Sequence, residues 1–116
     1  MNAKVVLGKC PRSKDLYGIR IEECGKDWVR TWAFKVAASR AKREGYEEAK
    51  VSGTMQPTPE YPACPHCGER NVALCSCGKL FCWYEETSFG TAVCPWCEKK
   101  GEYEPTDRIE VAGGGL

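Results

Sequence analysis

Apolar and polar residues alternate in the first third of the chain with the period of two that is typical of β-strands. An apolar run at residues 3–9 is followed by two alternating segments at 16–23 and 28–36, and turn-forming residues fill both gaps. Aromatic and β-branched residues are common in these segments, which favours strands over helices. The pattern predicts a three-stranded antiparallel meander over residues 4–36.

The same alternation assigns side chains to the two faces of this meander. One face of the second strand carries Tyr17, Ile19 and Ile21. One face of the third strand carries Trp28, Arg30, Trp32, Phe34 and Val36. Large apolar side chains on one face of a sheet are normally covered. Trp28 and Trp32 are therefore expected in the core of the N-terminal sheet.

The pattern changes after residue 36. Residues 37–44 are good helix formers, and Gly45 stands where a left-handed cap residue is expected. Residues 51–61 are rich in Pro, Thr and Gly, which predicts a linker, and the glycine-ended tail is expected to be flexible. The predicted units are a meander with a short helix at 1–56, a zinc-ribbon lobe at 57–104 and a tail at 105–116. Neither lobe carries enough apolar surface to stand alone, so we expect them to pack as one small α+β, mainly β domain.

Nine cysteines give this short chain its candidate chemistry. Six of them form three close pairs: Cys64 with Cys67, Cys75 with Cys77, and Cys94 with Cys97. Such pairs suit a tetrahedral zinc ion, whereas an odd count suits a complete set of disulfides poorly. The sequence also shows no signal-peptide pattern and no run of ~20 apolar residues, which predicts a cytoplasmic protein that does not enter a membrane.

Two pairings of these ligands are open. In the first, one zinc ion binds Cys64, Cys67, Cys94 and Cys97, as in an ordinary zinc ribbon. In the second, one ion binds Cys75, Cys77, Cys94 and Cys97. Cys64 and Cys67 then need two more ligands, and Cys82 and Cys10 are the candidates, because Cys10-Pro11 also begins like a zinc-binding turn. We expect one or two ions, with two favoured.

The remaining candidates are more simply structural. Cys24 is expected to be a buried free thiol, and the same alternative is open for Cys82. The ring of His66 is expected to point away from the metal that its two neighbours hold. The third pair is followed by Glu98 where the other two have glycine, which predicts a less regular turn. Trp83 and Trp96 are expected to be ribbon core or surface anchors.

The cysteine motifs and their surroundings resemble the TerY-C metal-binding domain family. The resemblance rests on CPHCG, VALCSCGKLFCW and CPWC, and it extends upstream to KCPRSKDLYGIRIEE, DWVRTWAFK and AKREGY. It implies a zinc-dependent interaction module without catalysis, with seven metal-ligand candidates: Cys64, Cys67, Cys75, Cys77, Cys82, Cys94 and Cys97. The family typically follows a von Willebrand factor A domain in bacterial systems linked to tellurite resistance and stress, which also contain a kinase and a phosphatase. No such domain is present in this sequence, so a stand-alone version or an excised domain is expected.

Charge is unevenly distributed along the chain and bears on the competing functions. Residues 1–60 carry a net charge of +4 and residues 61–116 carry −3. Each four-thiolate zinc site makes the second half still more negative, which disfavours nucleic acid as a partner. A nucleic-acid-binding ribbon remains the alternative, with a basic patch formed by Arg12, Lys14, Arg20, Arg30, Arg40, Lys42 and Arg43. A thiol oxidoreductase using the CxxC pairs is less favoured, because no helix is predicted after them. We therefore expect a non-enzymatic module that binds another protein.

Overall fold

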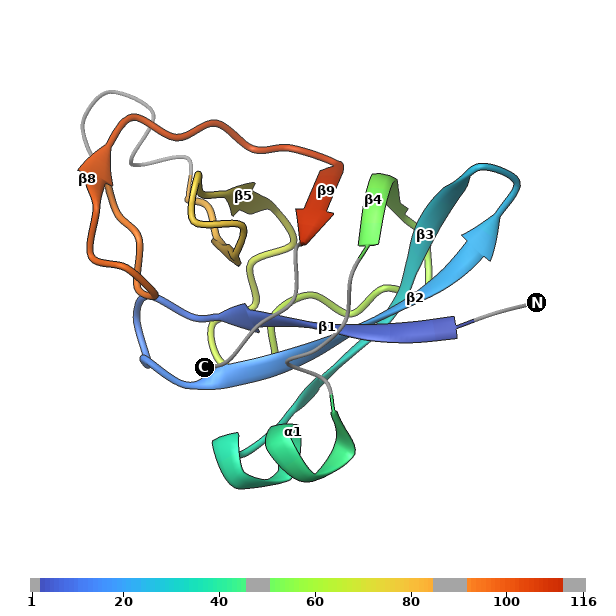
Figure 1. The fold of residues 1–116 in the computed structure, drawn as a ribbon, viewed down its shortest axis with the longest axis horizontal. Coiled ribbons are helices and arrows are strands. Elements are labelled where there is room, and N and C mark those ends of the chain that lie inside the picture. Colours follow the sequence, from blue (N-terminus) through green and yellow to red (C-terminus); the bar gives the residue numbers. More distant parts are fainter. Residues whose placement is uncertain (1–2, 46–50, 85–91, 112–116) are drawn as a thin grey trace.

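The fold is mainly β with one short helix, as the sequence predicted (Figure 1). The computed structural model describes residues 3–45, 51–84 and 92–111, and the last four of these by their backbone alone. The elements in these residues are β1 (Ala3–Lys9), β2 (Leu16–Cys24), β3 (Asp27–Lys35), α1 (Ala38–Glu44), β4 (Val51–Pro57), β5 (Val72–Leu74), β6 (Leu80–Cys82), β7 (Ala92–Val93), β8 (Lys100–Gly101) and β9 (Arg108–Val111).

The predicted meander is present as β1, β2 and β3. β2 pairs antiparallel with both of its neighbours, and Ile19 lies opposite Val6 of β1 and Ala33 of β3. The side chains of Tyr17, Ile19 and Ile21 are fully buried, so the predicted inner face of β2 is confirmed. This face is the centre of the main apolar core, which also contains Val72 and Leu80 from the second half of the chain.

The prediction for the third strand is wrong at Trp32. The register of β2 and β3 shifts between Arg20 and Ile21, which pair with Trp32 and Arg30 and leave Thr31 as an extra residue. Such a bulge reverses the alternation of side chains along the strand. Arg30 therefore points inward before the bulge, whereas Trp32 after it is 52% exposed. Trp28, which precedes the bulge, packs against the core while remaining partly exposed.

The strands of both halves form one sheet of seven strands, in the order β5-β6-β1-β2-β3-β4-β9. β6 pairs in parallel with the end of β1, where Gly8 lies opposite Leu80 and Lys9 opposite Phe81. The two ends of the sheet also approach each other, because the backbone N–H of Thr106, two residues before β9, donates to the carbonyl of Val72 in β5 at 2.9 Å. In Figure 1, β5 accordingly lies close to β9. The short strands β7 and β8 pair only with each other.

Two segments predicted to lack regular structure contain strands. β4 occupies most of the predicted linker, pairs in parallel with β3 and buries Val51 and Met55. The predicted flexible tail contains β9, which pairs antiparallel with β4. The rest of the tail, from residue 112, lies outside the described residues. The Pro, Thr and Gly residues that suggested a linker are compatible with a strand near the edge of a sheet.

The helix α1 lies on one side of the sheet in Figure 1. Ala41 is fully buried and packs with Leu7 and Val36, while the charged residues of the helix are exposed. Gly45 has a φ of 75° and caps the C-terminus of the helix, as predicted. Within the described part of the chain, no helix has the length and apolar character required to cross a bilayer.

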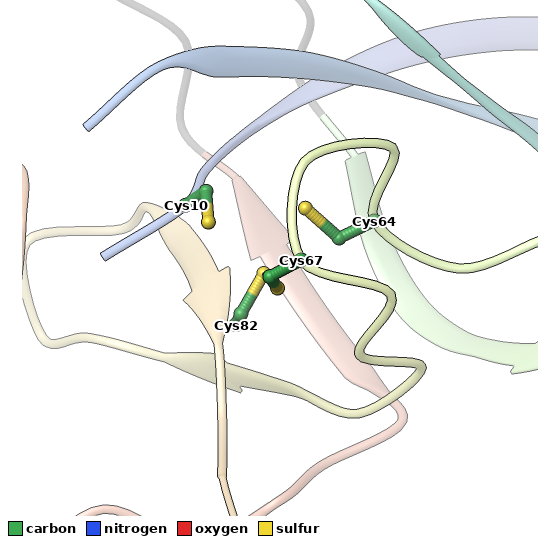
Figure 2. Close-up of side chains that lie close together, drawn as sticks. All are labelled: Cys10, Cys64, Cys67 and Cys82. Atoms are coloured by element: carbon green, nitrogen blue, oxygen red, sulfur yellow. The ribbon is translucent and has the colours of Figure 1, made fainter. Parts of the chain in front are cut away.

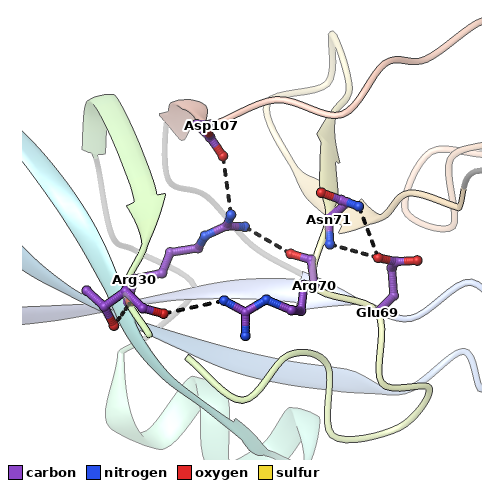
Figure 3. Close-up of polar contacts among 6 residues, drawn as sticks. Arg30, Glu69, Arg70, Asn71 and Asp107 are labelled. Atoms are coloured by element: carbon purple, nitrogen blue, oxygen red, sulfur yellow. Dashed lines mark hydrogen bonds and ion pairs between the residues drawn. The ribbon is translucent and has the colours of Figure 1, made fainter. Parts of the chain in front are cut away.

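Arg30 is a charged side chain in the interior, and it links β3 to the C-terminal segment (Figure 3). Only 2% of its side chain is exposed, and it forms an ion pair with the half-exposed Asp107 at 3.3 Å. Its guanidinium also lies 4.9 Å from the ring centroid of Tyr61. Burial lowers the pKa of Arg30, while the charge of Asp107 opposes that shift. A buried cation needs its counter-ion, so Asp107 should hold the segment before β9 against the sheet.

We predict that Asp107→Asn lowers the free energy of unfolding by about 1–3 kcal/mol, because it leaves Arg30 buried without a carboxylate. Denaturant unfolding of the metal-loaded protein would measure the change. Glu104→Gln removes an exposed carboxylate from the same segment and should change stability by less than about 0.5 kcal/mol. Equal free energies of unfolding for the two variants would contradict the stabilising role of the ion pair between Arg30 and Asp107.

Candidate metal centres

Four tight turns, each beginning at a cysteine, share one backbone design. In three of them the N–H of the cysteine donates to the carbonyl five residues later, and the N–H four residues later donates back to the cysteine carbonyl. These turns begin at Cys10, Cys64 and Cys94, with N–O distances of 2.7–3.0 Å. The turn at Cys75 is one residue shorter and uses Lys79 and Gly78 in the same way. In the turn at Cys64, the backbone N–H of His66 also donates to the cysteine sulfur at 3.4 Å.

One residue in each turn has positive φ: Lys14 (64°), Gly68 (80°), Gly78 (84°) and Glu98 (64°). Glycine adopts this conformation without strain, whereas lysine and glutamate do so at a cost. The sequence predicted that the turn ending at Glu98 would be less regular. That prediction is wrong, because the hydrogen bonds of this turn match those of the turn ending at Gly68.

The turn at Cys10 has the form of a zinc-binding turn but carries only one cysteine. Its sequence CPRSK matches CPHCG, with Ser13 in the position of the second cysteine. Ser13 instead accepts a hydrogen bond from the backbone N–H of Asp15 at 3.2 Å. This turn therefore supplies a single thiol, and the fourth thiol of its group must come from another element.

That fourth thiol is Cys82, at the end of β6. Because Lys9 and Phe81 are paired between the parallel strands β1 and β6, the residues that follow them, Cys10 and Cys82, lie next to each other. Cys64 and Cys67 complete the group (Figure 2), and all four sulfurs lie within 4.8 Å of one another. We call this group the joint site, because it combines a cysteine of the N-terminal half with three of the C-terminal half.

The joint site is deeply enclosed. Cys10, Cys64 and Cys82 are at most 3% exposed. Two tyrosine hydroxyls contact its sulfurs: Tyr17 lies 3.3 Å from Cys82, and Tyr84 donates to Cys67 at 3.2 Å. Hydrogen bonds to a thiolate stabilise its charge and fix its orientation, as neighbours of metal ligands commonly do.

The second group contains Cys75, Cys77, Cys94 and Cys97, and we call it the ribbon site. Its sulfurs also lie within 4.8 Å of one another. The distance from Cys75 to Cys97 is 3.6 Å, and that from Cys77 to Cys94 is 3.9 Å. Cys75 and Cys94 are buried, whereas Cys77 and Cys97 are exposed. The ribbon site is therefore more open to solvent than the joint site.

The sulfur–sulfur distances fit a tetrahedral metal ion. Four sulfurs at about 2.3 Å from a central ion are about 3.8 Å apart. The Sγ atoms of Cys67 and Cys82 in the joint site are 3.8 Å apart, and the two distances of the ribbon site bracket this value. Both groups thus have the donor type, number and spacing of closed structural metal sites.

The acid–base properties of the thiols point to the same chemistry. A hydrogen bond from Cys82 lowers the pKa of Cys64 to about 5, and that bond together with burial raises the pKa of Cys82. In the ribbon site, burial opposes ionisation of Cys75, but hydrogen bonds from the Cys77 backbone and Tyr103 lower its pKa to about 6. Burial and its bond to Cys75 raise the pKa of Cys77 to about 12. Without a cation the thiols share protons, and a divalent ion would displace those protons.

The candidate ligands form the second of the two pairings that the sequence allowed, in which Cys75 and Cys77 lie with Cys94 and Cys97. Cys64 and Cys67 lie in a different group from Cys94 and Cys97, so the ordinary ribbon pairing is not formed. Cys82 and Cys10 lie with Cys64 and Cys67. Cys24 belongs to neither group, and the expectation that it is buried is wrong, because it is exposed at the end of β2 beside a turn.

The sequence predicted the orientation of His66 but not the contacts of Tyr17 and Tyr84 with the thiols. The imidazole Nε2 of His66 lies 2.9 Å from the carbonyl of Leu16, so the ring contacts the N-terminal half instead of either thiol group. The roles of Tyr17 and Tyr84 were not foreseen. The sequence places Tyr17 only on one face of its strand, and no local motif links either tyrosine to a cysteine far away in sequence.

Comparison with known proteins agrees with this geometry. The family described as TerY-C metal binding domain matches residues 1–114, which is nearly the whole chain. Neither a curated protein nor a solved structure matched the sequence.

We predict that the protein binds two metal ions per chain, one at each group of four thiols. Cys10→Ser and Cys94→Ser should each reduce the content to one tightly bound ion, because a hydroxyl is a far weaker ligand than a thiolate. Cys24→Ser should retain both ions and is the matched control. Native mass spectrometry of the reduced protein would count the ions. Loss of an ion from Cys24→Ser, or two tightly held ions in Cys10→Ser, would contradict the grouping.

We also predict that a chelator removes the metal of the ribbon site roughly tenfold faster than that of the joint site, because exposed sulfurs and fewer enclosing groups make exchange easier. Alkylation during chelation, with peptide mass spectrometry, would show which thiols are released first. Tyr17→Phe should accelerate release at Cys82 and leave Cys77 and Cys97 unaffected. Earlier alkylation of Cys64 and Cys82 than of Cys77 and Cys97 would count against this order.

Proposed function

Because the chain belongs to the TerY-C metal-binding domain family, we propose that it is a zinc-dependent scaffold that binds a partner protein. The observation that carries this proposal is the pair of four-thiol groups, which lie at the joints of the fold. In the joint site, thiols from the turn after β1, a loop and β6 meet, so a bound ion would fix three segments relative to one another. A metal placed in this way serves structure and leaves the outer surface for recognition.

Zinc is the ion that the donors support best. Four thiolates in tetrahedral arrangement select zinc or iron among the common metals, and closed structural sites of this type are usually zinc sites. When bound, zinc would supply a positive charge that keeps all four thiols ionised. Tyr17 and Tyr84 would then donate hydrogen bonds to thiolates of the joint site.

The absence of catalysis is part of the proposal. Each CxxC pair shares its group with two further cysteines, so neither pair stands alone as a redox pair. The imidazole Nε2 of the chain's single histidine, His66, lies 2.9 Å from the carbonyl of Leu16, and only the backbone N–H of this residue donates to a sulfur, that of Cys64. Both arrangements favour structural thiols over nucleophiles, which would need an accessible thiolate with a substrate site beside it.

A protein partner fits better than nucleic acid. The basic patch suggested by the sequence loses Arg30, which is buried in an ion pair. Two zinc–thiolate centres would also add negative charge to the C-terminal half, which opposes phosphate binding. We further propose that the partner belongs to a bacterial stress-response system in the cytoplasm and is a von Willebrand factor A protein, a kinase or a phosphatase, as the family resemblance suggests.

We predict that the purified protein contains zinc, lacks the visible absorption of iron–thiolate centres, and shows no reductase activity. Elemental analysis would identify the metal, and turbidity of insulin would report disulfide reduction. A gel shift with a DNA duplex at two salt concentrations tests the alternative function, a zinc ribbon that binds nucleic acid. Reduction of insulin at the rate of a dedicated oxidoreductase, or tight salt-sensitive DNA binding, would refute the scaffold proposal.

A further inference from the structure

A groove of about 430 Å³ lies where the two halves of the chain meet at the surface. Three segments form its walls: the turn that follows β1, the start of α1, and the turn that contains Trp96. The lining residues used below are Lys9, Lys14, Asp15, Leu16, Val36 and Trp96. We call it the Trp96 groove. Its volume is suited to one or two side chains of a bound peptide.

The apolar wall of the groove is held in place. The indole N–H of Trp96 donates to the carbonyl of Leu80 at 2.7 Å, which fixes the orientation of the ring. Leu16 and Trp96 pack against a small core that contains Val36, yet both remain partly exposed. A fixed, partly exposed aromatic ring beside aliphatic side chains is an anchor point for a bulky apolar side chain.

The rim of the groove is basic. The ammonium of Lys9 lies 5.4 Å from the ring centroid of Trp96, and that of Lys79 lies 5.0 Å from it. Lys14 is an exposed part of the rim, and Asp15 is the acidic residue in the lining. The helix α1, whose start lines the groove, carries the exposed residues Arg40, Lys42 and Arg43, and its one carboxylate, Glu44, is at its far end. Contact with an aromatic ring does not neutralise the ammonium of Lys9, so Lys9 and the exposed Lys14 make the rim favour carboxylates.

We propose that the Trp96 groove binds an acidic peptide segment of a partner protein. A bulky apolar side chain of the peptide lies against Trp96, and flanking carboxylates lie near Lys9 and Lys14. This assignment rests on the proposed scaffold function and names its docking surface. Nucleic acid is less suited, because Asp15 lies in the wall and a groove of this size leaves little room for a run of phosphates.

The position of Trp96 couples this groove to metal binding. Trp96 lies between Cys94 and Cys97 of the ribbon site, in the turn closed by the hydrogen bond from Glu98 to Cys94 at 2.8 Å. An ion at the ribbon site would fix this turn and, together with the bond to Leu80, the position of the indole. Removal of that ion should weaken peptide binding even where the rest of the fold is kept.

The test uses the zinc-loaded full chain and a phage-displayed library of random 12-residue peptides. Peptides enriched on the wild type should carry Asp or Glu on both sides of a large apolar residue. The enriched peptides, synthesised, should shift the indole N–H signal of Trp96 in ¹⁵N spectra. Lys14→Glu should weaken their binding at least roughly tenfold. This variant suits the turn, because Glu98 has the same φ of 64° at the matching position. Lys26→Glu, in the exposed turn between β2 and β3, should not change it.

Each of the other outcomes would contradict the proposed peptide binding by the Trp96 groove, and the outcomes can be told apart. Enriched peptides that bind wild type and Lys14→Glu equally would place the interaction elsewhere and leave the scaffold function standing. Enriched peptides without acidic residues would refute the proposed chemistry. A twelve-nucleotide oligo-dT that shifts the Trp96 indole signal would assign the groove to nucleic acid. A failure to enrich any peptide would count against both the groove and the scaffold function.

Discussion

The fold depends on four thiols from both halves of the chain meeting at the joint site. The two halves pair along β4 and β9, and also through a short stretch of β1 and β6 that contains only the pairs Gly8–Leu80 and Lys9–Phe81. The same pairing aligns Cys10 with Cys82, and the turn at Cys64 brings two more sulfurs to them. Four clustered thiols, three of them buried, cannot all ionise without a cation, and ionised thiols cannot remain together without one. A metal ion bound here and the short pairing would therefore stabilise each other.

This dependence accounts for features that would otherwise be costly. Lys14 and Glu98 hold left-handed backbone conformations that most residues avoid. Both terminate turns whose first cysteine faces a metal site, so the binding energy of an ion can offset the strain. The apolar core reinforces the arrangement, because Tyr17 and Ile19 of β2 pack with Val72 and Leu80 of the C-terminal half. Metal sites, turns and core thus act as one unit instead of three separate ones.

Much of this could be predicted from the sequence, because the strongest signals are local. The alternation of apolar residues identified β2, and the close cysteine pairs identified the turns that supply the thiols of the candidate metal sites. Long-range features were less accessible. The bulge at Thr31 turns Trp32 to the opposite face of the sheet, and no residue pattern in the sequence predicts this bulge. β4 and β9 have weak strand signals of their own and form because neighbouring strands offer unpaired backbone groups. The choice between two ligand pairings required knowing that β1 and β6 lie side by side.

The most direct test of this account is amide hydrogen exchange of β2 with and without metal, in reduced protein. The amides of Ile19 and Ile21 lie in the N-terminal meander, far in sequence from the cysteine pairs. If the joint site unites the two halves, removal of metal should abolish their protection, and Cys10→Ser should weaken it in the presence of metal. Protection of these amides that is the same in metal-free and metal-loaded protein would contradict the central claim and show that the meander folds independently.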